Sequence, residues 1–232
     1  MIRSIQSLIN NRIAATDGEV GKVKDMYFDD QTWRLRYLVV ETGNWLFGRK
    51  VLISPVALGE PDWDAGFFPA NLTTDQVKNS PDVNSEKPVS RQEEADLHNH
   101  YSWPGFGVGG AGFVTTGMVG AVIDPTVPLD EAVYQDSKSA DPHLRSFSQV
   151  QGYDVYFTGE HPVGEVADLL IDTSSWRIIA MQIGKGGNGE ESGNYFVSTS
   201  VVKKIEYETS SLFIDPNEEL KQSVDEISPV IE

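Results

Sequence analysis

A duplicated segment constrains this chain more than any other feature of its sequence. The stretch from Thr16 to Ser54 returns closer to the C-terminus with the same order of glycine, acidic and aromatic residues. The offset is 143 positions between Gly21 and Gly164 (164 − 21 = 143), and it is the same between Trp33 and Trp176. A constant offset across such a motif indicates one folding unit used twice.

The duplication extends beyond this motif and sets the predicted domain boundaries. Arg3-Ser4 returns as Arg145-Ser146 at an offset of 142 (145 − 3 = 142). The offset rises to 143 because the second copy has one residue more in the loop before its glycine. Insertions in turns leave the flanking strands intact, as expected of a true repeat. In chain order, the predicted organisation is a first domain over 1–80, a linker over 81–142, a second domain over 143–223 and an acidic tail over 224–232.

Period-two alternation predicts that the repeat is built from strands. The clearest strand begins at Trp33, with Trp33, Leu35, Tyr37 and Val39 expected on one face. The alternation of the preceding strand slips near Asp25, which indicates a β-bulge of the kind that curves a sheet. We therefore predict an all-β fold of two tandem small β-barrels joined by a long linker that contains a short helix.

The linker begins with a helix signal and continues into an aromatic, glycine-rich run. Ser90 is a good N-cap, and Glu93 three residues later completes a capping box for a helix over 88–98. Tyr101, Trp103 and Phe106 follow, and we expect them to pack across a barrel or on a partner chain. Short helical turns are also predicted at 74–78 and, as its counterpart, at 217–221.

Composition and charge narrow the classes of function. The chain has no cysteine, which excludes disulfides and thiolate chemistry, and its formal net charge is −17. A field of that sign repels phosphate backbones and argues against direct nucleic-acid binding. The first 80 residues are nearly neutral, so their basic side chains form either a docking face for an anionic group or solvated strand-edge charges. No signal-peptide or membrane-helix pattern is evident, and we expect a soluble cytoplasmic protein, with peripheral membrane association left open.

The glycine strand, the acidic turn, the tryptophan-led strand and the Val51-Leu52-Ile53-Ser54-Pro55 strand together resemble the PRC-barrel family. The resemblance covers about 1–80 and 143–223, and the linker is similar to that of free-standing bacterial members with two copies. The family includes the cytoplasmic domain of the photosynthetic reaction centre H subunit and the C-terminal domain of the ribosome maturation factor. It implies a small six-stranded barrel per copy that serves as an adaptor, and it supplies no catalytic residues.

Several motifs permit a chemical function and each also has a structural explanation. Residues 105–110 fit G-x-G-x-x-G but lack the strand and helix of a dinucleotide site. His98 and His100 are metal ligands or exposed linker histidines. Asp29-Asp30 and Asp172 are calcium ligands or turn residues. Asp25 and Asp168 are an acid/base pair or, as we favour, acceptors of a hydrogen bond specific to the fold.

The sequence thus predicts a non-enzymatic adaptor with no cofactor, no metal and no assigned catalytic residue. Its partner is another protein, with membrane-associated electron-transfer complexes of the reaction-centre kind suggested by the resemblance. Self-association, for example as a dimer, is also expected. The alternatives are a small-molecule or metal-responsive binding protein and a ribosome-associated factor. The residues predicted to contact a partner are Arg34, Arg36, Trp45, Phe47, Arg49, Lys50, Tyr101, Trp103 and Phe106.

Overall fold

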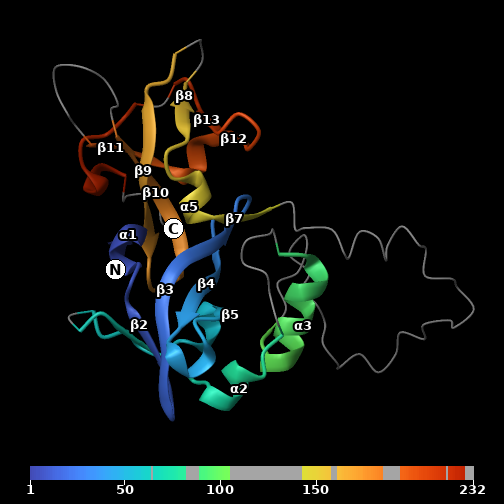
Figure 1. Ribbon diagram of the computed structural model, residues 1–232. Helices are drawn as coiled ribbons and strands as arrows, with labels where there is room; N and C mark the ends of the chain where they lie inside the picture. The colour runs from blue at the N-terminus through green and yellow to red at the C-terminus, as the bar shows by residue number, and fades with distance from the viewer. Residues whose placement is uncertain are drawn as a thin grey trace, which may run out of the picture. The chain divides into compact units, whose positions relative to one another are not determined.

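Apolar residues form strands in both halves of the chain in a computed structural model (Figure 1). It describes residues 1–63, 65–81, 89–104, 143–157, 161–184, 194–217 and 219–227. The strands of the first half are β1 (Ile2–Ser4), β2 (Arg12–Ala15), β3 (Gly18–Asp29), β4 (Leu35–Thr42), β5 (Lys50–Ile53) and β6 (Phe67–Pro69). Those of the second half are β7 (Leu144–Ser146), β8 (Asp154–Tyr156), β9 (Gly164–Asp172), β10 (Arg177–Gly184), β11 (Asn194–Ser198), β12 (Val202–Glu206) and β13 (Ser211–Ile214).

The helices are short and mostly begin at a side-chain cap. They are α1 (Ile5–Leu8), α2 (Thr74–Lys78), α3 (Arg91–Tyr101) and α5 (Phe147–Val150), with 3₁₀ turns η1 (Asn44–Leu46), η2 (Pro55–Ala57), η4 (Thr199–Val201) and η5 (Val224–Glu226). Ser90 and Glu93 form the predicted capping box of α3, which runs three residues beyond the expected end at His98. The predicted α2 is present, whereas its expected counterpart near Lys221 is replaced by an isolated bridge between Lys221 and Phe196. No helix among the described residues has the length and apolar character needed to cross a bilayer.

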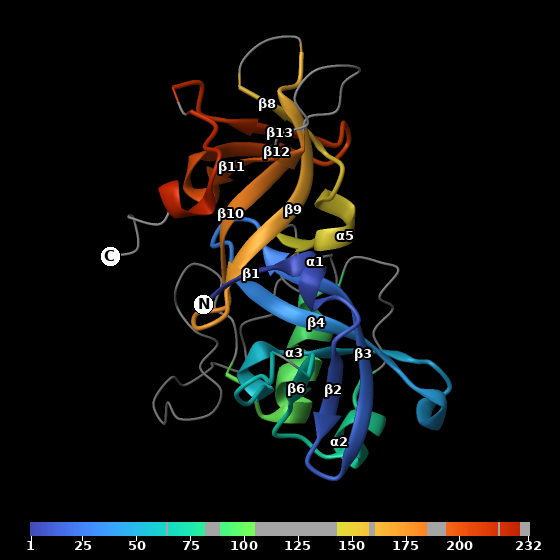
Figure 2. The same cartoon turned by 90° about the vertical axis from the view of Figure 1, so that its left-hand side faces the viewer.

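The strands form two sheets, and each sheet includes one strand that belongs to the other sequence repeat. The first has the order β11-β10-β9-β8-β13-β12, and β1 of the first repeat pairs with its β9. The second has the order β5-β4-β3-β2-β6, and β7 of the second repeat pairs with its β3. Figure 2 shows β1 alongside β9, with α1 at its end. The repeats therefore exchange their N-terminal strands.

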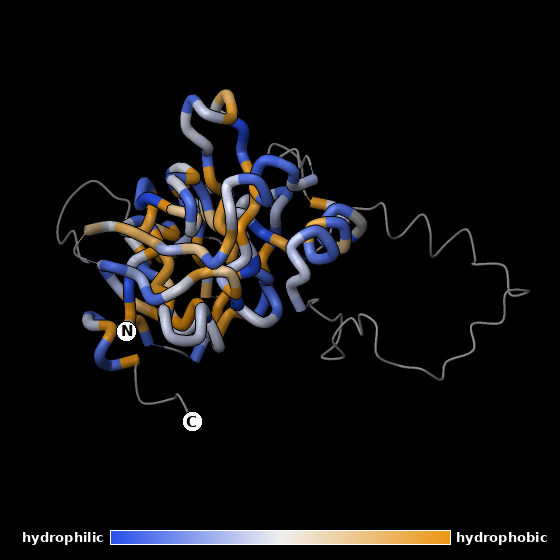
Figure 3. The backbone as a smooth tube through the Cα atoms, turned by 90° about the horizontal axis from the view of Figure 1, so that it is seen from below, coloured by the Kyte–Doolittle hydropathy of each residue, from blue (hydrophilic) through white to orange (hydrophobic). Residues whose placement is uncertain are grey.

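The mostly β fold class is confirmed, but the closed tandem barrels predicted from the sequence are not. In the part of the chain that the structure describes, the strand paths end at β11 and β12 in one sheet and at β5 and β6 in the other. Hydrophobic and hydrophilic stretches both occur along the backbone (Figure 3), and the largest fully buried side chains include Tyr37, Phe28 and Phe68. In β4 both faces are covered, because every residue from Leu35 to Val40 is buried.

The repeated glycines mark places where another strand leaves no room for a side chain. A Cβ built on Gly21 would lie 2.0 Å from the carbonyl oxygen of Glu41, and one on Gly164 would lie 2.5 Å from that of Gly184. Glu41 and Gly184 are themselves related by the repeat offset of 143 (184 − 41 = 143). The duplicated glycine is therefore required by close strand packing.

The repeated tryptophans do not open a strand as predicted, because each adopts a left-handed backbone. Trp33 has φ 56° and Trp176 has φ 52°. The carboxylate of Asp29 accepts hydrogen bonds from the backbone N–H groups of Gln31 and Thr32, and the Trp33 N–H binds the Asp29 carbonyl at 2.8 Å. This Asx-stabilised turn delays the start of β4 to Leu35.

By spatial contacts the chain divides into two compact units that differ from the two sequence repeats. Unit 1 comprises Met1–Asn11, Lys22–Val39 and His143–Glu232, and unit 2 comprises Arg12–Gly21 and Val40–Pro142. Unit 1 thus holds the second repeat together with the exchanged parts of the first. Unit 2 holds the remaining parts of the first repeat and the linker helix.

Candidate interaction site

The loop between β4 and β5, residues 43–50, is here called the hairpin tip and contains four of the predicted contact residues. Gly43 begins the 3₁₀ turn η1, and the chain then reverses through two left-handed residues, Phe47 with φ 56° and Gly48 with φ 71°. Thr42 closes the base, since its N–H and its hydroxyl both donate to the Arg49 carbonyl, at 2.9 Å and 2.8 Å. The backbone of the tip is therefore defined by local hydrogen bonds.

Two long side chains anchor this tip to the rest of unit 2. The indole N–H of Trp45 donates to the carbonyl of Val20 at 2.9 Å. The Arg49 guanidinium donates to the carbonyls of Lys78, Ser80 and Pro81 at 3.2, 2.8 and 2.9 Å. Lys78 ends α2, so Arg49 meets carbonyls at and just after a helix C-terminus, where a cation is favoured. Arg49 is therefore a positioning residue for the tip.

The exposed part of the hairpin tip is apolar and basic. Phe47 is 98% exposed, Trp45 is 39% exposed, and Lys50 is exposed at the start of β5. No acidic residue occurs between Glu41 and Glu60, in a chain whose net charge is −17. The tip is thus a local exception to the acidity of the chain, and it presents apolar rings to solvent.

The predicted contact residues Arg34 and Arg36 do not belong to the hairpin tip. Arg34 is exposed and forms an isolated antiparallel bridge with Arg177. Arg36 is buried, and its guanidinium lies 3.4 Å from the Asp29 carboxylate, with exposed side-chain fractions of 10% and 17%. Arg36 therefore contributes to the interior of unit 1.

The linker aromatics are packed inside unit 2. Tyr101 and Trp103 stack with ring centroids 4.2 Å apart, and both are buried. Burial raises the pKa of Tyr101, an effect that the Ser80 hydroxyl and the Arg49 charge oppose. His98, predicted to be an exposed linker histidine, is instead buried with its ring edge toward Trp103 at 5.9 Å. Phe106 lies outside the described residues.

Asp25 and Asp168 accept the structural hydrogen bonds that we favoured, and the donors belong to the opposite repeat. Asp25 accepts from the hydroxyls of Ser146 at 2.5 Å and Ser148 at 2.7 Å. Asp168 accepts from the Ser4 hydroxyl and from the Gln6 N–H. Ser4 and Ser146 are also the N-caps of α1 and α5. Each carboxylate thus holds the start of the other repeat's first helix.

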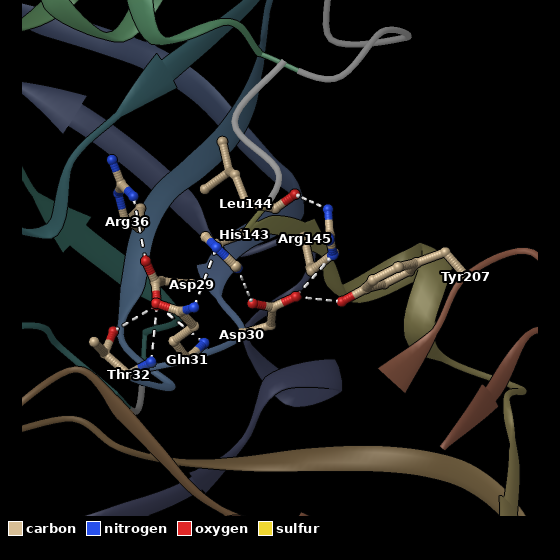
Figure 4. Close-up of polar contacts among 9 residues, drawn as sticks. All are labelled: Asp29, Asp30, Gln31, Thr32, Arg36, His143, Leu144, Arg145 and Tyr207. Carbon is tan, nitrogen blue, oxygen red and sulfur yellow. Dashed lines mark hydrogen bonds and ion pairs between the residues drawn. The ribbon is translucent and has the colours of Figure 1, made fainter. Parts of the chain in front are cut away.

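A second polar cluster surrounds Asp30 in unit 1 (Figure 4). The Asp30 carboxylate faces His143 Nδ1 at 3.0 Å, Arg145 Nε at 3.0 Å and the Tyr207 hydroxyl at 2.5 Å. The Arg145 guanidinium also lies over the Tyr207 ring, 3.6 Å from its centroid. Burial and the hydrogen bond to Asp30 raise the pKa of the Tyr207 hydroxyl above its ordinary value. With three donors bound, Asp30 acts as a structural acceptor joining β7 and the end of β12 to the turn after β3.

In the part of the chain that the structure describes, the metal-binding alternatives considered from the sequence receive no geometric support. No group of three or more histidine, aspartate or glutamate side chains among the described residues is arranged to hold a metal ion. His100 lies 2.8 Å from the carbonyl of Gln76, and the acidic residues of the two turns bind serine, threonine and basic groups of their own unit. The G-x-G-x-x-G motif at 105–110 lies outside the described residues.

Sequence reasoning missed the Asp30 cluster and the strand exchange. No sequence motif includes Tyr207, and the sequence suggested only a turn residue or a calcium ligand for Asp30. One available signal was the departure of the repeats from each other, since Asp30 corresponds to Thr173 at the offset of 143 (173 − 30 = 143). A carboxylate present in one copy alone indicates a contact present in one copy alone.

Comparison with known proteins agrees with the duplicated motif. The family profile described as "PRC-barrel domain" matches residues 2–62 and 142–221, which together exceed half of the chain. The chain therefore belongs to the PRC-barrel domain family. An uncharacterised protein from Deinococcus radiodurans is 34% identical over 74 residues, which are 32% of this chain. The chain spans 26% of that relative's length.

Proposed function

We propose that this protein is a non-enzymatic, cytoplasmic adaptor that binds another protein through its hairpin tip. Membership of the PRC-barrel domain family supports an interaction module. Its partners on this proposal are membrane-associated complexes of the electron-transfer kind, a suggestion that rests on the resemblance to the reaction centre H subunit alone.

The backbone of Phe47 is the observation that carries the proposal. A left-handed conformation costs a non-glycine residue about 1–2 kcal/mol, and a ring that is 98% exposed adds no burial to offset that cost. Glycine, which already follows at position 48, would fold there without strain. A large apolar side chain at such a position is explained by contact with something outside the chain.

The charges and anchors around Phe47 fit the same proposal. Trp45 and Arg49 are the residue types most often found at the centre of protein interfaces, and both are held in place before a partner arrives. A pre-positioned tip loses little conformational freedom on binding. The basic, acid-free segment 42–59 favours a partner surface with an acidic patch.

The test is site-specific photocrosslinking in cells with a benzophenone amino acid placed at position 47. The matched control is position 56, since Val56 is a second exposed apolar residue, at 52% exposure, in the same unit. We expect one discrete adduct from position 47, absent from position 56, which mass spectrometry identifies. Equal labelling from both positions, or none above background from position 47, would contradict the proposal.

A further inference from the structure

The exchanged strands are related by a local two-fold symmetry inside unit 1. The Leu35 N–H donates to the Trp176 carbonyl at 2.8 Å, and the Ile178 N–H donates to the Trp33 carbonyl at 2.7 Å. These two bonds are interchanged by the repeat offset, because 35 corresponds to 178 and 33 to 176. The bridge between Arg34 and Arg177 lies between them in sequence and joins equivalent residues. This is the geometry of an isologous dimer contact, made within one chain.

The strand exchange obeys the same symmetry residue by residue. Tyr27 pairs with Ser146 in one ladder, and the equivalent Leu170 pairs with Ser4 in the other. Beyond the ladders, the Asp30 N–H donates to the His143 carbonyl and the Thr173 N–H donates to the Met1 carbonyl, both at 2.9 Å. The edges of β3 and β9 that face away from β4 and β10 are therefore equivalent acceptors of equivalent segments. Each of these edges, here called the outer edges, also pairs with β2 or β8 of its own repeat along another part of the strand.

Each docked segment combines main-chain pairing with two buried apolar side chains and a serine hydroxyl that donates to a carboxylate of the receiving strand. Ile5 and Leu8 of α1 are fully or almost fully buried, as are their equivalents Phe147 and Val150 of α5. The segments share an Arg-Ser pair followed by these apolar positions. Strand addition of this kind takes affinity from backbone bonds and specificity from the side chains that alternate with them.

We propose that the outer edges of β3 and β9 are docking surfaces for the N-terminal segment of a PRC-barrel repeat. The two repeats of this chain are each other's occupants, and they hold together as a non-covalent pair that does not need the linker. Asp25 and Asp168 position the docked segments, since each binds the hydroxyl that caps the incoming helix. The partner class for these edges is another copy of the repeat.

The experiment starts from the full chain with a protease site inserted between residues 104 and 143. After folding, the linker is cut, and the halves are examined by size-exclusion chromatography with light scattering. We expect both halves to elute together at the mass of the uncut chain. Dissolving the cut protein in denaturant and diluting it should restore the same one-to-one pair, because the edges recognise the segments in trans.

A double variant, Asp25→Asn with Asp168→Asn, tests whether the edges hold the pair. Loss of charge-assisted hydrogen bonds at each edge should raise the dissociation constant of the cut halves about tenfold per edge, so about a hundredfold in all. Asp215→Asn is the matched control, because Asp215 is a carboxylate whose hydrogen bonds and ion pair stay within the second repeat. Uncut samples are checked by circular dichroism, since the intact linker keeps the local concentration of the segments high.

If the double variant fails to fold, Ser148→Ala provides a milder test, because it removes one hydroxyl donor to Asp25 at an exposed position. It should weaken the cut pair measurably while the circular dichroism spectrum stays unchanged. Halves that separate on cutting and remain folded overturn the proposal. Halves that associate equally tightly with and without the carboxylate and serine substitutions overturn it as well.

Discussion

The Asp29–Trp33 turn and the Asp172–Trp176 turn have similar backbones and different side-chain partners. Both turns end in a left-handed tryptophan. In each turn the first aspartate accepts hydrogen bonds from the residues two and three positions after it. In the first turn Asp29 is paired with Arg36, whereas in the second Asp172 binds the N-terminal ammonium group at 3.1 Å. The comparison teaches that the duplicated fold preserves the turn and the strand exchange, while the charges that satisfy them have diverged.

The largest effect is expected where the two repeats are most alike, at the glycines that face a neighbouring carbonyl. Gly21→Ala should lower the free energy of unfolding by about 3 kcal/mol or more, and Gly164→Ala by somewhat less, because their Cβ contacts would be 2.0 Å and 2.5 Å with backbone atoms. Urea unfolding measures both. Gly43→Ala is the control, since its Cβ would meet only a Trp45 side-chain atom at 3.7 Å. Equal stability of all three variants would show that the close approach is not a constraint.

The second prediction exchanges Asp30 of the first turn and Thr173 of the second, which occupy equivalent positions. Asp30→Thr gives the first turn the residue of the second, removing the acceptor of His143, Arg145 and Tyr207. We expect a loss of about 1–3 kcal/mol in unfolding free energy, because partly buried donors lose a charged acceptor. Thr173→Asp, the reverse exchange, should cost less, because it removes only the single side-chain hydrogen bond that the Thr173 hydroxyl donates to the Met1 carbonyl. If both exchanges cost the same, the Asp30 cluster is not the source of the difference.

The contrast between the repeats also explains what the sequence could reveal. The constant offset between Gly21 and Gly164 was sufficient to predict the duplication, the strand content and the repeated turn, because close strand packing at a glycine and aspartate-stabilised turns restrict residue type. The capping box at Ser90 and Glu93 predicted α3 for the same reason. These are local constraints, and local constraints are visible in a single sequence.

Non-local pairing was not visible in the same way. Asp25 and Asp168 were correctly interpreted as hydrogen-bond acceptors of the fold, but nothing in the spacing shows that their donors lie in the opposite repeat. A strand such as β1 satisfies the same pattern whether it pairs within its own repeat or with the other, since both edges are equivalent. The burial of Arg36 was missed because it depends on which elements cover β4, whereas the packing of Trp103 within the chain is one of the two arrangements expected of the linker aromatics.

The third prediction uses pH to test the hydrogen bonds that Asp172 accepts in the second turn. Burial of Asp172 opposes its ionisation, but hydrogen bonds from Ser175 and Ser174 outweigh it and hold its pKa well below the usual range. A lowered folded-state pKa contributes stability that is present above the unfolded value of about 3.9 and is lost as pH falls below it toward the folded value. Asp172→Asn should therefore be less stable than the wild type at pH 6, by about 1 kcal/mol, with the gap narrowing below pH 4. Thermal unfolding from pH 6 to pH 2.5 measures this, and a gap that widens on acidification would contradict the sign.

The smallest effect on stability, expected at the hairpin tip, separates residues kept for folding from those kept for contact. Phe47→Gly removes an exposed ring and relieves a left-handed backbone, so the unfolding free energy should stay the same or rise by up to about 1 kcal/mol. Arg49→Ala is the contrasting variant and should destabilise the protein, because three carbonyls near the end of α2 lose their donor. Thermal melts of both variants, beside crosslinking of the wild type from position 47, distinguish the roles. A marked destabilisation by Phe47→Gly would mean that the ring serves the fold, and it would remove the physical basis for treating this tip as a partner contact.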